Sequence, residues 1–210
     1  MNQQDAIEEI ALIRRVMDES RRFTSDSGKY YIMWGIIIAV AIFAQYAVNL
    51  TQNESLSVWI WAVAIGLGVI VSVFFGMREG STGASWPVGA KLIALIWGSS
   101  FVSMILIGVI GPLTGALRSW AICPAMAAIM GSAYIISSLA YRMKWVAMVG
   151  TAWWLGSLVM FWIHGIATLP IYGVMMIFFE IVPGLVFYRV SKISSEGNPQ
   201  GAWAGENNIV

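Results

Sequence analysis

Glu180 is the residue best suited to do chemistry in this 210-residue chain. It is the only acidic residue between Lys91 and Val190, and it stands at the centre of the apolar segment 171–190. An ionisable side chain at the middle of a membrane costs about 3 kcal/mol or more to insert, and it normally faces the protein interior or a water-filled cavity. Loss of water also favours the neutral form of a carboxyl group. The sequence therefore predicts a proton-binding or cation-binding site at Glu180.

Two prolines predict kinks in the apolar segments. Pro183 has no amide hydrogen, so it frees the carbonyl of Phe179, the residue just before Glu180. Pro124 is expected to kink the fourth apolar segment in the same way. These kinked helices are the expected moving parts.

Several polar and aromatic side chains match Glu180 in depth if each apolar segment is a helix that rises about 1.5 Å per residue. They are Ser99, Ser100 and Ser103 on the third segment, Ser132 and Tyr134 on the fourth, and Trp153 and Trp154 on the fifth. A carboxyl group surrounded by hydroxyls and indole rings would suit a small or lipophilic cation, through charge and cation–π contact. Proton exchange at Glu180 would then drive transport. The alternative is a permanently protonated Glu180 that forms hydrogen bonds between helices and fixes their packing.

These residues can share one depth only if membrane-spanning helices carry them, and the composition of the chain indicates such helices. The chain is 59% hydrophobic and 11% charged, whereas a soluble domain carries roughly a quarter charged residues. Apolar runs long enough to cross a bilayer, about 20 residues each, cover 30–50, 57–76, 91–110, 117–140, 145–164 and 171–190. We therefore expect an all-α membrane protein with a six-helix transmembrane bundle over 29–190. A cytoplasmic segment, 1–28, precedes the bundle and a flexible cytoplasmic tail, 191–210, follows it.

The basic residues predict the orientation of the bundle. All 12 Lys and Arg residues except Arg118 lie before the first segment, after the sixth, or at the ends of segments and in gaps on that same side. Basic residues near spanning helices are retained on the cytoplasmic side. Both termini are therefore expected in the cytoplasm, with the bacterial inner membrane as the default location.

Residues 4–24 are predicted to form an amphipathic helix before the first span. Its broad apolar face is flanked by Arg14, Arg15, Arg21 and Arg22, a pattern typical of helices that lie in the lipid interface. Alternatively, its short heptad-like register favours docking on a cytoplasmic protein or on a second copy of the chain.

The start of the chain also carries a resemblance. Residues 13–22 (Ile-Arg-Arg-Val-Met-Asp-Glu-Ser-Arg-Arg), followed by Tyr-Tyr-Ile-Met-Trp-Gly at 30–35, resemble the beginning of a group of uncharacterised bacterial multi-pass inner-membrane proteins. The resemblance covers about the first 35 residues. It implies a bacterial membrane protein and brings no activity and no site residues with it.

The sequence gives little indication of an enzyme active site or a metal site. Ser157 and His164 are separated by about 10 Å along one predicted helix, which is too far for a nucleophile and its base. Cys123 is the single cysteine and His164 the single histidine, so we expect no metal cluster and no haem. We expect no catalytic residue, no cofactor and no nucleic-acid partner.

Two hypotheses remain from the sequence. The first is a proton-coupled secondary transporter of a small or lipophilic cation, which needs a polar, hydrated cavity that reaches Glu180. The second is a non-transporting membrane subunit or sensor whose N-terminal helix docks a cytoplasmic partner. A subunit of this kind needs an exposed apolar groove or face, and its core can be dry.

Overall fold

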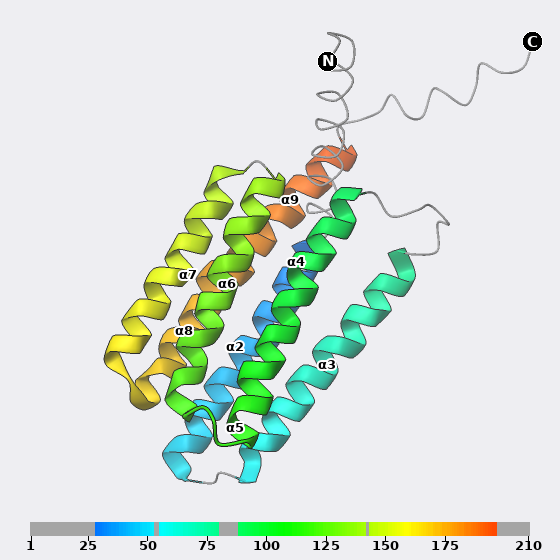
Figure 1. The fold of residues 1–210 in the computed structure, drawn as a ribbon. Helices are drawn as coiled ribbons and strands as arrows, with labels where there is room; N and C mark the ends of the chain where they lie inside the picture. The colour runs from blue at the N-terminus through cyan, green and yellow to red at the C-terminus, as the bar shows by residue number, and fades with distance from the viewer. Residues whose placement is uncertain (1–27, 53–54, 80–87, 142, 197–210) are drawn as a thin grey trace, which may run out of the picture.

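The computed structural model describes residues 28–52, 55–79, 88–141 and 143–196, and all regular structure there is helical (Figure 1). Six helices in it are long and apolar enough to cross a membrane, which identifies the chain as a multi-pass membrane protein. The amphipathic helix predicted for 4–24, with its four arginines, lies outside the described residues. So does the part of the predicted tail over 197–210, whereas 191–196 continue the last helix.

Four of the spans are continuous α-helices, and two contain a π-helical turn. The continuous ones are α2 (Gly28–Thr51), α3 (Ser55–Glu79), α6 (Ser119–Tyr141) and α7 (Lys144–Ile163). The third span is built from α4 (Val88–Ile105), the π-turn η2 (Leu106–Ile110) and the short α5 (Gly111–Leu113). The sixth consists of the 3-10 turn η3 (Gly165–Ala167), α8 (Thr168–Met176), the π-turn η4 (Ile177–Ile181) and α9 (Val182–Glu196).

The sixth span begins earlier than predicted. Its predicted start is residue 171, directly after Pro170, but the helical span runs over Gly165–Arg189. Pro170 lies in the first turn of α8, where a missing amide hydrogen removes no intrahelical bond. A proline there is compatible with a helix start, so the predicted boundary was wrong.

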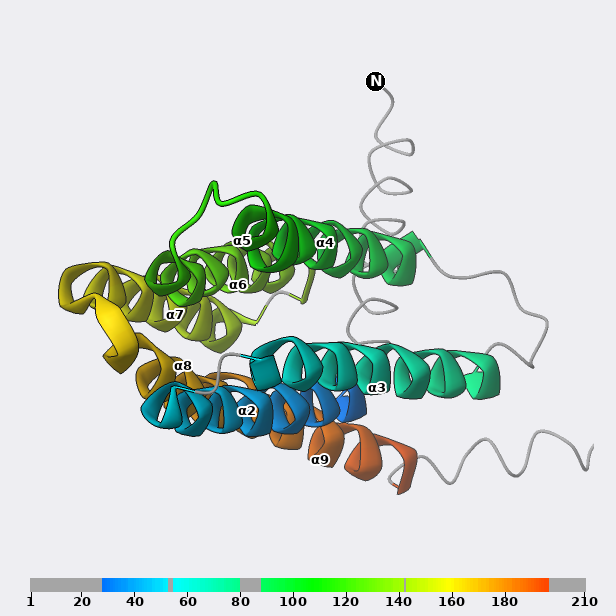
Figure 2. The ribbon, with the colours of Figure 1, turned by 90° about the horizontal axis from the view of Figure 1, so that it is seen from below.

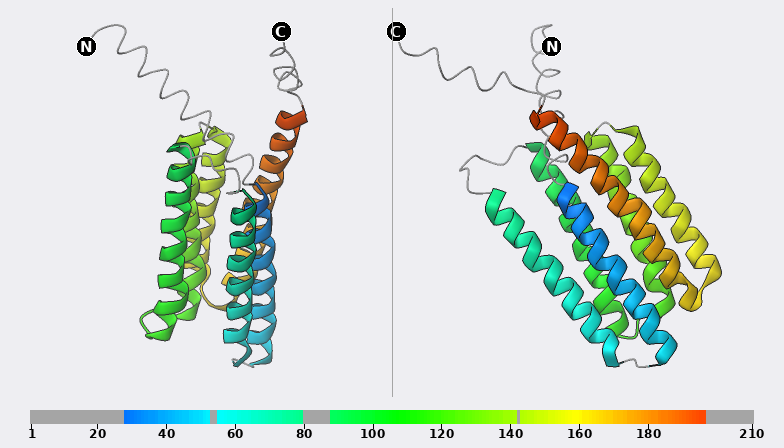
Figure 3. Two further views of the ribbon diagram at one scale, coloured as in Figure 1. Left: turned by 90° about the vertical axis from the view of Figure 1, so that its right-hand side faces the viewer. Right: turned by 180° about the vertical axis from the view of Figure 1, so that it is seen from behind.

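The spans pack as two layers (Figures 2 and 3). One layer holds α4, α6 and α7 in that order, and the other holds α3, α2 and the sixth span. The layers contact each other where α6 and α7 meet α8 and η4, while α3 packs chiefly against α2. The two layers therefore meet closely along one edge, and α3 and α4 form the opposite edge.

Glycines allow the closest approaches within each layer. A Cβ atom on Gly150 of α7 would lie 2.9 Å from the carbonyl oxygen of Gly131 on α6. A Cβ atom on Gly184 of α9 would lie 2.9 Å from the backbone nitrogen of Ile32 on α2. Small residues at such contacts let helix backbones pack tightly, which is a main source of association between membrane helices.

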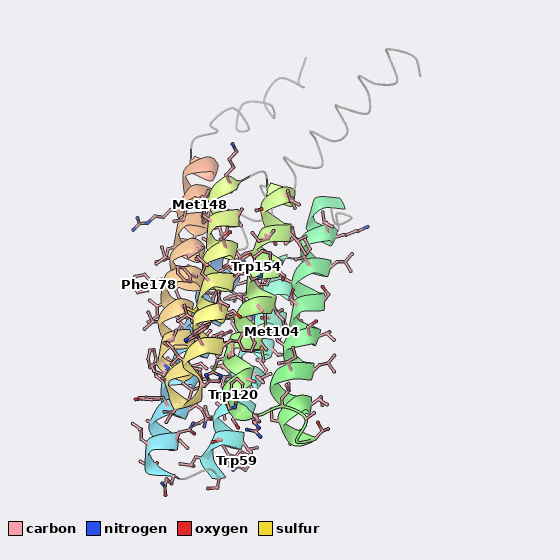
Figure 4. The ribbon with its side chains drawn as sticks, turned by 60° about the vertical axis from the view of Figure 1, so that its left-hand side comes forward. Trp59, Met104, Trp120, Met148, Trp154 and Phe178 are labelled. Carbon is pink, nitrogen blue, oxygen red and sulfur yellow. The ribbon has the colours of Figure 1, made fainter. Side chains whose placement is uncertain are left out.

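The outer surface of the bundle is apolar. Met148, Phe178 and Trp59 carry exposed side chains on three different spans (Figure 4). In water such a surface would be unfavourable, but lipid tails are as apolar as these side chains. The surface is therefore the one expected of a protein surrounded by lipid.

Candidate functional site

A large groove lies between the two layers on the side where α3 and α4 form the edge. It has a volume of about 1550 Å³ and is lined by α2, α3, the third span, α6 and the sixth span. Binding sites for drug-sized molecules usually measure about 300–1,000 Å³, so this space can hold a molecule of lipid size. We call it the α3–α4 groove.

Glu180 lies on the wall of the α3–α4 groove, on the π-turn η4. Its side chain is 4% exposed, and the hydroxyl of Tyr134 on α6 donates a 2.8 Å hydrogen bond to Glu180 Oε2. Gly35 brings α2 close on another side, since a Cβ atom there would lie 3.3 Å from Glu180 Cγ. Three different spans thus meet at the carboxyl group.

In the part of the chain that the structure describes, no basic residue lies at the depth of Glu180. Every Lys and Arg from Lys29 to Arg189 lies near the end of a span or in a connecting segment. A carboxylate held in an apolar interior without a countercharge is very unfavourable. Either a proton or a cation would remove this unfavourable charge.

The π-turn at Glu180 has a cause in the sequence. Pro183 cannot donate a hydrogen bond to the carbonyl of Phe179, and the indole nitrogen of Trp153 on α7 donates to that oxygen instead, at 3.4 Å. Trp153 is fully buried and packs against the rings of Tyr172 and Phe179. Single π-turns inside α-helices are frequent at functional sites.

Pro124 lies inside α6, as predicted. Its own carbonyl oxygen accepts a 2.7 Å hydrogen bond from the hydroxyl of Ser157 on α7. That bond joins α6 to α7 and engages the serine that the sequence analysis weighed as a nucleophile. His164 lies just beyond α7, where its ring packs 4.9 Å from that of Trp120.

An aromatic cluster adjoins the carboxyl group. The ring of Trp97 on α4 lies 5.1 Å from that of Tyr31 and 5.5 Å from that of Tyr134, both edge-to-face. The ring of Phe187 on α9 lies 5.4 Å from that of Tyr31. Trp97 lines the groove, and its indole nitrogen is buried without a hydrogen-bond acceptor among the described residues. The groove wall therefore contains a buried donor that a bound molecule could use.

The structure brings two of the predicted site residues to Glu180, namely Tyr134 by a direct hydrogen bond and Trp153 through the neighbouring carbonyl. It places Trp154 elsewhere. That side chain is 45% exposed, and its indole nitrogen donates to the carbonyl oxygen of Ala128 on α6 (Figure 4).

The predicted serines also lie away from Glu180. Ser99, Ser100 and Ser103, together with Ser132, line a separate pocket of about 270 Å³ between α4 and α6. The hydroxyls of Ser99 and Ser100 donate to the carbonyl oxygen of Ile96, and that of Ser103 to Ser99. Their hydrogen bonds therefore stay within their own helix, as serines in membrane helices commonly do.

A polar cluster in the groove was not predicted from the sequence. Gln45 of α2 is 9% exposed, and its amide nitrogen donates to Asn49 Oδ1 at 2.6 Å and to Ser57 Oγ at 2.8 Å. The indole nitrogen of Trp61 donates to Gln45 Oε1 at 3.2 Å. We call these four residues the Gln45 cluster, and all four line the groove. The available signal was that Gln45 is the only glutamine inside the six spans.

No protein-family model matches the chain, and no curated protein or solved structure is significantly similar to it. The class that the fold defines is that of a multi-pass membrane protein with six spans. Function must accordingly be argued from the groove and the side chains that line it.

Proposed function

We propose that the protein binds a lipophilic cation in the α3–α4 groove and carries it across the membrane in exchange for protons at Glu180. The observation that supports this most directly is the carboxyl group of Glu180 on the wall of a large groove between the spans, at a depth where the described residues include no Lys or Arg. Proton and cation would occupy the carboxyl group in turn, because either one neutralises it.

The lining of the groove favours a lipophilic cation over a hydrated one. Apolar and aromatic side chains such as Ile65, Phe101 and Met126 make up most of the wall. Trp97, Tyr31 and Tyr134 offer rings near the carboxyl group, and a desolvated cation–π contact contributes about 2 kcal/mol. A cation with apolar substituents would reach this site from the lipid, between α3 and α4.

The exchange needs no covalent step. When the cation arrives, the proton leaves Glu180, and the hydroxyl of Tyr134 continues to donate to the carboxylate. Transport then requires the site to face each side of the membrane in turn. We propose that the two layers rock about the edge where α6 and α7 contact α8 and η4, with the π-turn and Pro183 as the flexible point.

In the proposed setting the protein lies in the bacterial inner membrane with both termini in the cytoplasm, as the distribution of basic residues predicts. We propose that it is not an enzyme and that the exchange uses no cofactor and no metal.

A second candidate is the non-transporting subunit or sensor. The apolar wall and the position of the groove at the α3–α4 edge favour it, because a transmembrane helix of a partner could occupy the same space. In that case Glu180 would stay protonated and serve packing through its bond to Tyr134. The two candidates differ in whether a cation binds and displaces a proton.

The experiment that separates them is binding of labelled tetraphenylphosphonium to the purified protein in lipid nanodiscs, with the pH of a weakly buffered solution followed at the same time. The transporter predicts saturable binding, release of protons on binding, and weaker binding as the pH falls. Glu180→Gln should lose all three. Ser132→Ala, at a similar depth but outside the groove, should keep them. Equal binding by wild type and Glu180→Gln would overturn the proposal.

A further inference from the structure

We propose that the Gln45 cluster is a second binding station in the same groove, which takes a neutral hydrogen-bonding group of the ligand. The ligand would then be elongated, with a cationic end at Glu180 and a hydroxyl, ether or carbonyl group at the other end. This inference rests on the proposed function, because it assumes a cation at Glu180.

The spacing of the two stations follows from one helix. Gly35 of α2 lies beside Glu180, and Gln45 stands ten positions further along the same helix. At about 1.5 Å per residue the two levels are separated by about 15 Å. An extended chain advances about 3.5 Å per three bonds, so about 12 to 13 bonds connect the stations.

The wall between the stations is apolar. Ile38 and Ile42 of α2 and Met176 of α8 line this stretch of the groove. A hydrocarbon chain therefore fits between the two polar ends, and a ligand that is polar along its whole length does not.

The chemistry of the cluster suits a neutral group. Its members are two carboxamides, a hydroxyl and an indole, which offer donors and acceptors and no charge. Ser57 Oγ accepts from Gln45, and a hydroxyl that accepts one hydrogen bond can still donate its own hydrogen to another acceptor. A polar group of the ligand can take that hydrogen and can donate in turn to the carbonyl oxygen of Gln45, which accepts one bond from Trp61 and has a second lone pair.

A purely structural role for the cluster must be separated from binding. The bond from Gln45 to Ser57 joins α2 to α3, and so does the 3.1 Å bond from the indole nitrogen of Trp34 to Ser72 Oγ. Ser57 and Ser72 both lie on α3 and both line the groove. Ser72→Ala is therefore a matched control for Ser57→Ala, since each removes one bond between the same two helices.

The test uses displacement of labelled tetraphenylphosphonium by two series of trimethylammonium compounds, one with plain alkyl chains and one with a hydroxyl at the chain end. In wild type the hydroxyl should strengthen binding about fivefold, and only at a chain length of about 12 bonds. Ser57→Ala should abolish the gain and Ser72→Ala should retain it. If Ser57→Ala fails to fold, Asn49→Ala serves in its place, because Asn49 orients the Gln45 amide.

The negative results distinguish failure of the second binding station from failure of the proposed function. If plain alkyl compounds displace the label but the hydroxyl adds nothing at any length, the second station is refuted and the proposed function stands. A gain of equal size at every length, or one lost equally in Ser57→Ala and Ser72→Ala, also refutes it. If neither series displaces a label that binds normally, this inference is refuted. If tetraphenylphosphonium itself does not bind, the proposed function fails and this inference fails with it.

Discussion

A tryptophan in place of Gly98 should block the α3–α4 groove without disturbing the fold. Gly98 lines the groove next to Trp97, and a Cβ atom built on it meets no atom within 4 Å. The new indole would therefore extend into open space and occupy part of the volume that the ligand needs. Removing a glycine from the interior of a helix also favours the helix by up to about 1 kcal/mol.

The size of the effect follows from the cost of forcing extra atoms into an occupied site. Overpacking of that kind costs about 1–3 kcal/mol. At about 1.4 kcal/mol for each tenfold change in affinity, tetraphenylphosphonium should bind about 5- to 140-fold more weakly to Gly98→Trp.

The matched control is Gly66→Trp on α3. A Cβ atom at Gly66 likewise meets nothing within 4 Å, but Gly66 is not among the residues that line the groove. Binding of labelled tetraphenylphosphonium in nanodiscs should be unchanged in this variant. If the two tryptophan variants bind the cation equally well, the α3–α4 groove is not the binding site.

Three further variants test the packing around the site. Gly150→Ala should lower the free energy of unfolding, measured by titration with a denaturing detergent, by about 1–3 kcal/mol, because the new Cβ atom would lie 2.9 Å from a backbone oxygen of α6. In the same titration the control Gly66→Ala should unfold no more easily than wild type. Tyr134→Phe should weaken cation binding about fivefold, since a hydrogen bond to a charged carboxylate is stronger than one to a neutral carboxyl group, and an affinity equal to that of wild type would remove Tyr134 from the site. Trp153→Phe loses the bond to the carbonyl of Phe179 and leaves part of a fully buried site unfilled, so it should lower the free energy of unfolding by about 1–3 kcal/mol, of which the bond accounts for about 0.6 kcal/mol; an unfolding free energy equal to that of wild type would contradict the role given to the indole.

The sequence predicted the six spans, apart from the start of the sixth, because a span depends on a local property of the chain. A run of apolar residues sets a span, and position within the run sets the depth. The bond between Tyr134 and Glu180 joins two residues that the sequence had matched in depth. Pro183 also pointed to the freed carbonyl of Phe179, although not to the indole of Trp153 that bonds to it.

The sequence could not say which way each side chain faces around its helix. In a soluble helix an apolar stripe marks the buried side, but a membrane helix is apolar on all sides because lipid surrounds it. Ser99 and Ser103 therefore matched Glu180 in depth and yet face a different pocket. For the same reason the groove at the α3–α4 edge was not predictable, since it depends on how two layers of helices diverge.

The Gln45 cluster was harder to predict than Glu180, because a carboxamide carries no charge and its insertion into a membrane is less costly. Its burial in an apolar span still requires hydrogen-bond partners, which the structure supplies from Asn49, Ser57 and Trp61. An uncharged polar residue inside a span is therefore also a signal of a polar site.

The most direct test of the central claim is reaction of the wild-type protein with dicyclohexylcarbodiimide, an apolar reagent that modifies protonated carboxyl groups within membranes, followed by mass spectrometry of the peptide that contains Glu180. Our account predicts modification at Glu180, together with protection by tetraphenylphosphonium that Gly98→Trp weakens and Gly66→Trp leaves intact. Modification that proceeds at the same rate with and without the cation would contradict the claim that proton and cation share this carboxyl group.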